Sequence, residues 1–385
     1  MTTRRGEALT ALRPAADLFG DVVTAYVDVG RASETGAQAV ETRINNLARD
    51  LESAGIDETT VSALTERLGR PTGHGGDASR VVVARDGKVV TDLVVGDGVA
   101  DHHHAGQVAH LLRLGRALAD AVSYVLVRVD HVGADITVSD TLGLDEREIV
   151  SEGDHDVLHK VPGGGWSHRR FQSRAEDSWD RNADTVAKDL DGLVREVQPD
   201  VVLLTGDPRG IARIRESVAG HVTERLEVLD HGSRAEGASD DRLDEEVAAA
   251  VRRCRAARID EVLDRLGPVD APKAVGVAET LEALRRGEVE TLVLLEGALE
   301  DRQAYAGPDP LLLATDPGDL TALGVDDPAP DRLEELMFRA ALAQDAGLLP
   351  LHAPVGALPD GVGAVLRFST RPDPNAQDDQ SGEDI

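Results

Sequence analysis

The sequence predicts an α/β protein made of three domains. Short apolar runs bounded by glycine or proline alternate with longer stretches whose apolar residues recur at helical spacing, a pattern typical of α/β folds. The chain has 385 residues, enough for two or three domains that each bury a core. A polar stretch rich in glycine and serine, residues 231–241, is predicted to be the linker before the last domain.

The first predicted domain, residues 1–120, is an α+β domain. An apolar strand is followed by two amphipathic helices, the first of which ends at Gly55, a residue suited to a helix C-cap. Two β-branched runs flank Asp86 and Gly87 and predict a hairpin, since Asp-Gly favours a tight two-residue turn. The expected elements are a strand over 21–30, helices over 34–55 and 56–69, and a hairpin over 79–96.

The second predicted domain, residues 121–230, fits a small α/β layer fold related to ribonuclease H. Its order is three strands, a helix, a strand, a helix and a strand. The run between Pro199 and Gly206 is apolar throughout and predicts a central buried strand. One face of the preceding helix carries Trp179, Ala183, Val186, Leu190, Leu193, Val194 and Val197. The elements are strands over 123–140 (two, around the turn 131–134), 144–153, 200–208 and 222–229, and helices over 172–197 and 209–218.

The third predicted domain, residues 240–372, alternates helices with strands and is expected to be an α/β/α sandwich. Residues 373–385 are charged and poor in apolar groups, so a disordered tail is expected there. The elements of the domain are helices over 242–266, 277–286 and 331–347, and strands over 290–297 and 310–316 with two closing strands.

Composition limits the class of function. A net charge of −30 argues against a broad nucleic-acid-binding surface, which needs a basic face. The single cysteine, Cys254, excludes an internal disulfide and a metal site built from several cysteines. We find no signal sequence and no apolar run long enough to cross a membrane, so a cytoplasmic protein is expected.

One segment departs from the acidic background. Between Lys160 and Arg174 there are four basic side chains and no acidic ones. Its core, GGGWSHRR (163–170), has neither Walker spacing nor the dinucleotide-binding fingerprint. The glycines alone are equally typical of a structural loop. However, Trp166 can stack on a base and Arg169 and Arg170 can bind phosphate, so the composition favours a local contact with RNA.

Other polar groups are interpreted as structural. We expect His102, His103 and His104 to form a polar loop rather than a metal site, because adjacent side chains in extended backbone point apart. Asp130, His131 and Asp135 are assigned to turn chemistry. Cys254 is interpreted as a packing residue. The surrounding basic residues are interpreted as a solvated helix face, and they are Arg252, Arg253, Arg255 and Arg258.

The layout resembles the superfamily of archaeal and eukaryotic class-I release factors and Pelota, over roughly residues 15–370. The nearest branch is similar to its bacterial members, which include actinobacterial Balon-type ribosome hibernation factors. The resemblance implies a ribonuclease H-like middle domain and a C-terminal domain of the kind shared with kink-turn-binding ribosomal proteins. It rests on the segments 163–183, 199–208, 287–297 and 361–369.

The resemblance also implies a site. Members enter the ribosomal A site in a tRNA-like shape and direct a loop of the middle domain at the peptidyl-transferase centre. In release factors this loop is Gly-Gly-Gln, whose Gln helps to place a water. Here His168 stands where a related branch has Gln, and the first domain has no Asn-Ile-Lys-Ser stretch for reading stop codons. The implied residues that contact rRNA or tRNA are Gly163, Gly164, Gly165, Trp166, Ser167, His168, Arg169, Arg170, Gln172 and Arg174.

Three functions stay open, in order of preference. The first is a non-enzymatic hibernation factor that is induced by stress, occupies the A site and arrives with elongation factor Tu or another translational GTPase. The second is a peptidyl-tRNA hydrolase that rescues stalled ribosomes, with Ser167 or His168 positioning the water. The third is a general RNA-binding adaptor, against which the acidic composition argues. No cofactor, metal or membrane is expected, and the protein is expected to be a monomer off the ribosome.

Overall fold

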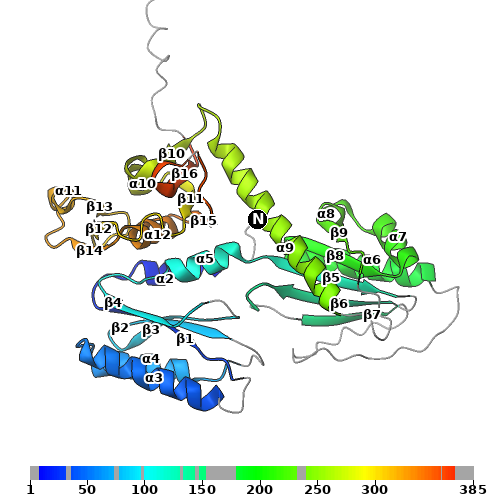
Figure 1. Cartoon of the computed structure of the whole chain (residues 1–385), viewed down its shortest axis with the longest axis horizontal. Coiled ribbons are helices and arrows are strands. Elements are labelled where there is room, and N and C mark those ends of the chain that lie inside the picture. Colours follow the sequence, from blue (N-terminus) through cyan, green and yellow to red (C-terminus); the bar gives the residue numbers. More distant parts are fainter. Residues whose placement is uncertain are drawn as a thin grey trace, which may run out of the picture. The chain divides into compact units, whose positions relative to one another are not determined.

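The structure, a computed structural model, contains two compact units, Met1–Asp260 and Glu261–Ile385. Both combine helices with sheets (Figure 1), so the predicted α/β class is confirmed. None of the helices it describes is long and apolar enough to cross a lipid bilayer. The predicted disordered tail, 373–385, lies outside the described residues. The structure describes residues 8–31, 36–72, 78–96, 99–130, 133–143, 147–152, 179–231, 240–356 and 358–368.

The first unit begins with an antiparallel sheet and the helices around it. The elements are α2 (Arg13–Ala16), β1 (Val22–Asp28), α3 (Gly36–Ser53), α4 (Glu58–Gly69), β2 (Ser79–Arg85), β3 (Lys88–Val95), β4 (His102–Gly106) and α5 (Leu112–Asp120). The strand order is β3-β2-β1-β4. The predicted hairpin is confirmed, because Asp86 and Gly87 have φ values of 48° and 72°, the left-handed conformation that such a turn requires.

Strand β1 has two apolar faces. Val23, Ala25 and Val27 pack against the apolar stripes of α3 and α4, which cover one side of the sheet (Figure 1). On the other side, the Tyr26 hydroxyl donates a hydrogen bond to the backbone oxygen of His110 at 2.8 Å. The strand is therefore a buried central one, as the apolar run 21–30 predicted.

The three adjacent histidines form a strand, so the predicted polar loop is wrong. β4 pairs with β1, and His102, His103 and His104 lie opposite Tyr26, Ala25 and Thr24. β4 is the last strand in the order of its sheet, and polar side chains are common in edge strands. Its composition therefore lacks the β-branched signal on which the prediction depended.

The second part of the first unit is a five-stranded sheet with helices on both faces. Its elements are β5 (Ser123–Val129), β6 (Gly133–Asp140), β7 (Arg147–Glu152), α6 (Trp179–Val197), β8 (Val201–Gly206), α7 (Pro208–Ser217), α8 (Gly220–Thr223), β9 (Leu226–Val228) and α9 (Asp240–Leu266). The strand order is β7-β6-β5-β8-β9, with β6 antiparallel to both neighbours and the other pairs parallel. The order of strands and helices from β5 to β9 is the one predicted from the sequence, apart from the short helix α8. The last strand is shorter than predicted because α8 occupies its first residues.

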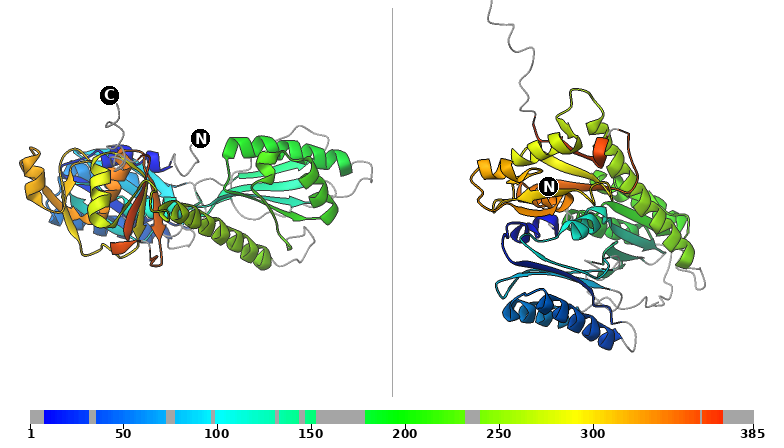
Figure 2. Two further views of the ribbon diagram at one scale, coloured as in Figure 1. Left: turned by 90° about the horizontal axis from the view of Figure 1, so that it is seen from above. Right: turned by 60° about the vertical axis from the view of Figure 1, so that its left-hand side comes forward.

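Alternate residues of the central strands bury the two faces of this sheet. Val125, Val127 and Val129 pack against α6 and α7. Leu126 and Leu203 point the other way and pack against α9. Figure 2 shows α6 and α7 on one side of the strands and α9 on the other. The helix that the sequence placed at the start of the third domain thus begins on the back of the middle sheet.

The second unit is built around a four-stranded sheet in the order β10-β16-β11-β15. Helix α10 packs against β10 and β16, and α12 packs against β11 and β15. The last turn of α9 is tied to this sheet by Arg265, whose two guanidinium nitrogens bind the carboxylate of Glu290 at 2.6 Å each and lower its pKa. The elements are β10 (Lys273–Val275), α10 (Gly276–Arg285), β11 (Val289–Leu295), β12 (Gln303–Ala306), β13 (Leu313–Ala314), α11 (Pro317–Ala322), β14 (Ala329–Arg332), α12 (Leu333–Ala343), β15 (Gly347–Leu351), the 3-10 turn η2 (Pro359–Gly361) and β16 (Val362–Leu366).

A small sheet, β13-β12-β14, distinguishes the second unit from the prediction. The apolar run 310–316 was expected to be a strand, but only Leu313–Ala314 is extended. Asp309 accounts for this, because its carboxylate accepts a hydrogen bond from the Leu311 N–H at 2.9 Å and its carbonyl accepts one from Leu312. The run therefore begins as a turn.

We expect Gly206→Ala to destabilise the first unit. Gly206 ends β8 with a φ of 121°, and an added Cβ would lie 2.0 Å from the backbone oxygen of Val129. Backbone strain of this kind costs about 1–3 kcal/mol, and the clash adds to it. The change in unfolding free energy is measured by urea denaturation, with circular dichroism as the signal.

The matched control is Gly192→Ala. Gly192 is exposed within α6, and nothing lies within 4 Å of an added Cβ. This substitution should stabilise the helix by about 0.5–1 kcal/mol. Equal unfolding free energies for the two variants would contradict the role given to Gly206.

Candidate functional site

The basic segment predicted to contact RNA lies between β7 and α6, within residues 153–178. All ten predicted contact residues, including the alternative catalytic pair Ser167 and His168, lie outside the described residues, and they are Gly163, Gly164, Gly165, Trp166, Ser167, His168, Arg169, Arg170, Gln172 and Arg174. What the structure describes is the scaffold on which this segment begins and ends. β7 ends at Glu152 and α6 begins at Trp179.

Two polar contacts tie β7 to α6. The hydroxyl of the buried Ser151 donates a hydrogen bond to the carboxylate of Asp189 at 2.7 Å. Near the other end of the strand, Arg147 pairs with Glu196 at 2.9 Å. These contacts show that β7 and α6 run in opposite directions. The base of the segment is therefore held by the core of the middle sheet and by side-chain contacts.

The strand register shows at which end of the middle sheet β7 ends and the segment begins. Glu152 pairs with Gly133, next to the turn that follows Val129 at the carboxyl end of β5. From Asp189 back to its first residue, α6 rises about 15 Å at 1.5 Å per residue. The first turns of α6 therefore run toward the same end of the sheet. The segment 153–178 begins and ends there.

Helix α6 is also fixed on its other side. Asp184 accepts a hydrogen bond from the Ser217 hydroxyl at 2.8 Å, at the end of α7. Asp191 accepts one from the Ala219 N–H at 3.0 Å, just before α8. Together with the apolar face that α6 buries against the sheet, these contacts leave the helix little freedom to rotate. Of the predicted face, the five residues from Val186 onward are in the core, and the side chains of Trp179 and Ala183 are outside the described residues.

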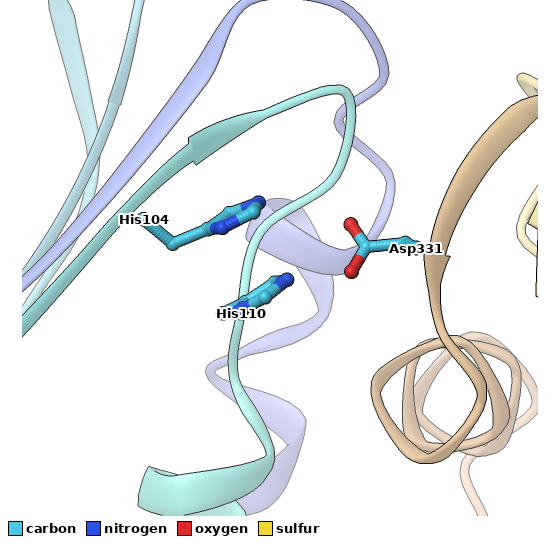
Figure 3. Close-up of side chains that lie close together, drawn as sticks. All are labelled: His104, His110 and Asp331. Carbon is cyan, nitrogen blue, oxygen red and sulfur yellow. The ribbon is translucent and has the colours of Figure 1, made fainter. Parts of the chain in front are cut away.

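The histidines singled out in the sequence lie far from this segment along the chain. In the first unit, the rings of His104 and His110 stack face to face, with centroids 3.3 Å apart and planes inclined by 7° (Figure 3). Asp331, also drawn, belongs to β14 of the second unit. The nitrogen lone pairs of two parallel imidazoles point in parallel directions, whereas metal ligands converge on one ion. We therefore describe the pair as aromatic packing.

Of the two acidic residues assigned to the β5–β6 turn, Asp130 is structural, as predicted, whereas Asp135 lies within β6 opposite Arg128 and Val150, so its assignment to the turn is wrong. The carboxylate of Asp130 accepts a hydrogen bond from the Gly133 N–H at 3.0 Å, and its own N–H donates to the Gly133 oxygen. This is the local hydrogen bonding that favours Asp in turns. His131 lies outside the described residues.

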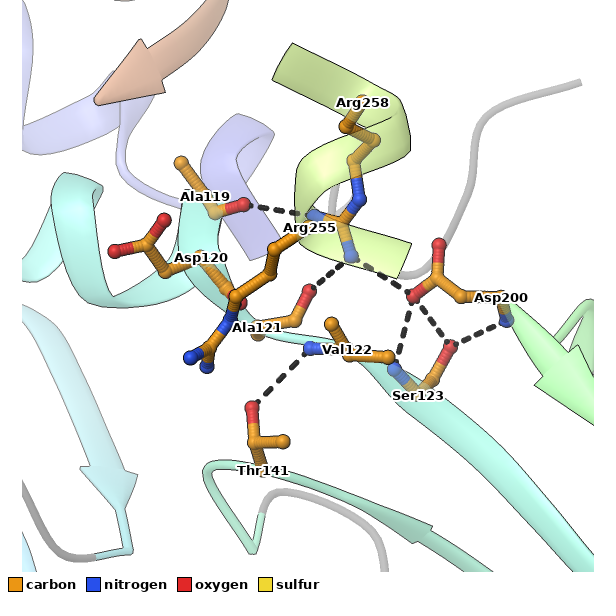
Figure 4. Close-up of polar contacts among 9 residues, drawn as sticks. All are labelled: Ala119, Asp120, Ala121, Val122, Ser123, Thr141, Asp200, Arg255 and Arg258. Atoms are coloured by element: carbon orange, nitrogen blue, oxygen red, sulfur yellow. Dashed lines mark hydrogen bonds and ion pairs between the residues drawn. The ribbon is translucent and has the colours of Figure 1, made fainter. Parts of the chain in front are cut away.

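The basic residues around Cys254 were expected to be a solvated helix face, and for two of them this is wrong. Arg255 and Arg258 bind the backbone oxygens of residues 119–121 (Figure 4). No local pattern distinguishes these two from Arg252, because their partners are far away in the sequence. Cys254 packs beside the apolar cluster between α9 and the sheet, and burial raises the pKa of its thiol, so the packing role is confirmed.

We expect Asp189→Ala to destabilise the scaffold of the basic segment. The substitution leaves the buried Ser151 hydroxyl without its acceptor, which costs about 1–3 kcal/mol. Because the two residues share one hydrogen bond, Ser151→Ala combined with Asp189→Ala should cost less than the sum of the single changes. Urea unfolding measures all three, with the exposed Lys188→Ala as control. If the losses of the two single variants add up to that of the double variant, the Ser151–Asp189 hydrogen bond contributes no stability.

The comparison with known families concerns the same part of the chain. Residues 123–268 match the family described as bacterial archaeo-eukaryotic release factor family 2. This range runs from the first residue of β5 to just beyond α9. It therefore includes the middle sheet, the basic segment and the helix on the back of the sheet. Over these residues, the match confirms the likeness to bacterial release-factor-like proteins that was inferred from the sequence.

Two relatives extend the likeness to most of the chain. They are uncharacterized proteins of two strains of Mycobacterium tuberculosis, each 26% identical over 356 residues, which are 91% of this chain and 94% of theirs. Their names carry no function.

Three of the solved structures that resemble this chain are the following. Pelota of Archaeoglobus fulgidus is 13% identical, with 95% of this chain and 93% of that chain covered and a TM-score of 0.34. Dom34 of S. cerevisiae, a translation termination-like factor, is 12% identical, with 78% and 82% covered and a TM-score of 0.38. An archaeal Pelota described bound to the ribosome with ABCE1 is 15% identical, with 96% and 95% covered and a TM-score of 0.39.

Whole-chain superpositions with TM-scores below 0.5 carry no argument of their own, so the assignment rests on the family match. Over residues 123–268, the chain is similar to the bacterial archaeo-eukaryotic release factor family 2.

Proposed function

We propose that this protein is a cytoplasmic, ribosome-binding translation factor that occupies the A site of idle ribosomes, as Balon-type hibernation factors do. The observation that carries the proposal is the position of the glycine-rich, acid-free stretch Lys160–Arg174, with its tryptophan and four basic side chains, inside the part of the chain that matches the release factor family. In this proposal the stretch is directed at the peptidyl-transferase centre.

The charge distribution supports contact through a small area. The chain has a net charge of −30, so most of its surface is repelled by the phosphates of rRNA. Arg169 and Arg170 would neutralise phosphates, and Trp166 would stack on a base. The three glycines, Gly163 to Gly165, would let the backbone approach RNA closely. Gln172 and Arg174 would add polar contacts on the return of the segment.

The scaffold also supports this role. A loop that reaches into an RNA site has to be attached to a rigid part of the protein. The contacts Ser151–Asp189 and Arg147–Glu196 join the two elements between which the segment runs. The segment thus starts from a fixed strand end and returns to a fixed helix.

The proposed partners are the ribosome and a translational GTPase of the elongation factor Tu class. The protein would be a monomer off the ribosome and would need no cofactor. It would act under stress, when idle ribosomes accumulate.

The alternative is a peptidyl-tRNA hydrolase that rescues stalled ribosomes. Ser167 and His168 favour it, because a hydroxyl and an imidazole next to two arginines can hold a water at a peptidyl ester. Replacement of an amide by imidazole favours the non-enzymatic reading, because neutral imidazole cannot donate and accept at the spacing of one amide group.

A sedimentation experiment distinguishes the two functions. The protein is mixed with vacant ribosomes and, separately, with ribosomes that hold a labelled peptidyl-tRNA, and the pellet and the label are followed. Binding to vacant ribosomes with the peptidyl-tRNA intact supports an occupancy factor. Release of the peptide that is lost in His168→Ala supports the hydrolase. Failure to sediment with either sample would overturn both.

We expect Arg169→Ala combined with Arg170→Ala to weaken binding to vacant ribosomes. Loss of up to two phosphate contacts should reduce the slope of log K against log salt by about one to two units. Sedimentation at several salt concentrations measures the slope. Arg242→Ala with Arg252→Ala, two exposed arginines of α9, is the control with the same change of charge. Equal slopes for both double variants would exclude the basic segment as the phosphate contact.

A further inference from the structure

The connector between the N-terminal part of the first unit and the middle sheet is hydrogen-bonded along its whole length. This connector, residues 119–123, joins the end of α5 to the start of β5. Interdomain connectors are commonly flexible, with backbone groups exposed to water. Here each carbonyl has a partner within the protein. Figure 4 shows the two arginines beside the carbonyls of residues 119–121.

Two arginines of α9 supply the first three partners. Arg255 Nε donates to the Asp120 oxygen at 2.8 Å. Arg258 donates through Nη1 to the Ala119 oxygen and through Nη2 to the Ala121 oxygen, both at 3.0 Å. These carbonyls lie at the C-terminus of α5, where helix carbonyls lack intrahelical donors and the helix dipole attracts a positive charge. The two guanidinium groups therefore cap α5 from a segment more than 130 residues away.

The remaining groups of the connector are held by the middle sheet. The Val122 N–H donates to the Thr141 hydroxyl and its oxygen accepts from the Thr141 N–H, both at 3.1 Å. The Ser123 N–H donates to the Asp200 carboxylate, and the Ser123 oxygen accepts from the Asp200 N–H, both at 2.9 Å. Arg258 also lies 3.5 Å from the same carboxylate oxygen of Asp200. One guanidinium group thus joins the end of α5, the start of β8 and α9.

We propose that Arg255 and Arg258 form a joint that holds the N-terminal part, residues 8–120, and the middle sheet in one fixed orientation. Both arginines are partly buried, and Arg258 is 18% exposed, so water competes weakly for these contacts. Away from the connector, the Gly96 N–H donates to the Leu142 oxygen. Without the joint, the N-terminal part can turn relative to the middle sheet. The proposal concerns the free protein and holds whether or not the protein binds ribosomes.

Pulsed electron paramagnetic resonance on the full chain tests the joint. Spin labels are placed at Glu52→Cys in α3 and Lys188→Cys in α6, two exposed helix positions, in a Cys254→Ala background that removes the single native cysteine. The parent should give one narrow distance distribution. Arg255→Ala combined with Arg258→Ala should make the distance distribution about twofold broader. Arg242→Ala combined with Arg252→Ala removes the same charge from the same helix and should leave it narrow.

Amide hydrogen exchange provides the second measurement. The amides of Ala121, Val122 and Ser123 should exchange about tenfold faster in the double variant, while those of β2 keep their protection. If the double variant does not fold, Arg258→Lys replaces it, because one ammonium cannot donate to Ala119 and Ala121 in the fork geometry of a guanidinium. A narrow distance distribution together with unchanged exchange in a folded variant overturns the proposal.

Discussion

The middle sheet has two apolar faces, and covering both of them determines how the first unit is built. A strand such as β8, with Val202 and Leu204 on one side and Val201 and Leu203 on the other, is stable only between two layers of helices. Helices α6 and α7 follow the strands in the chain and cover the near face. The far face requires a helix from elsewhere, and α9 supplies it. The helix that leads into the second unit is therefore also part of the core of the first.

Helices and strands with a strong periodicity of apolar residues could be predicted from the sequence. Which face of the sheet each helix covers could not. The helix over 242–266 was recognised and assigned to the third domain because it follows a polar linker. Its apolar side chains, among them Leu243, Ala250 and Val251, complete the core of the middle sheet. The uninterrupted apolar run of β8 does indicate a second layer of helices, because a strand that is apolar on both faces has to be buried on both. Only the three-dimensional arrangement shows which helix provides it.

Short and polar elements were the other source of error. β4 is formed by three histidines at a sheet edge, and β12 and β14 have four residues each, too few for a period to appear. The arginines of α9 are a similar case. Arg252 and Arg258 are alike in the sequence, and only the second meets backbone oxygens that lie far away along the chain. For the candidate site, composition identified the basic segment, whereas the ties of Ser151 and Arg147 that fix its base depend on tertiary structure.

The two ends of the middle sheet have different roles. Ser123 and Asp200, at the amino ends of the parallel strands β5 and β8, take part in the joint with α9. Glu152, beside the carboxyl end of β5, is the last residue of β7 before the basic segment. From its first to its last residue, β5 separates these ends by about 20 Å at 3.3 Å per residue. A close-packed, hydrogen-bonded sheet of five strands deforms little over that length. A rotation of the N-terminal part at the joint would therefore change where it lies relative to the base of the segment, without any change within the sheet. The position of the N-terminal part relative to the end of β7 and the start of α6 thus depends on a few hydrogen bonds at the opposite end of the sheet.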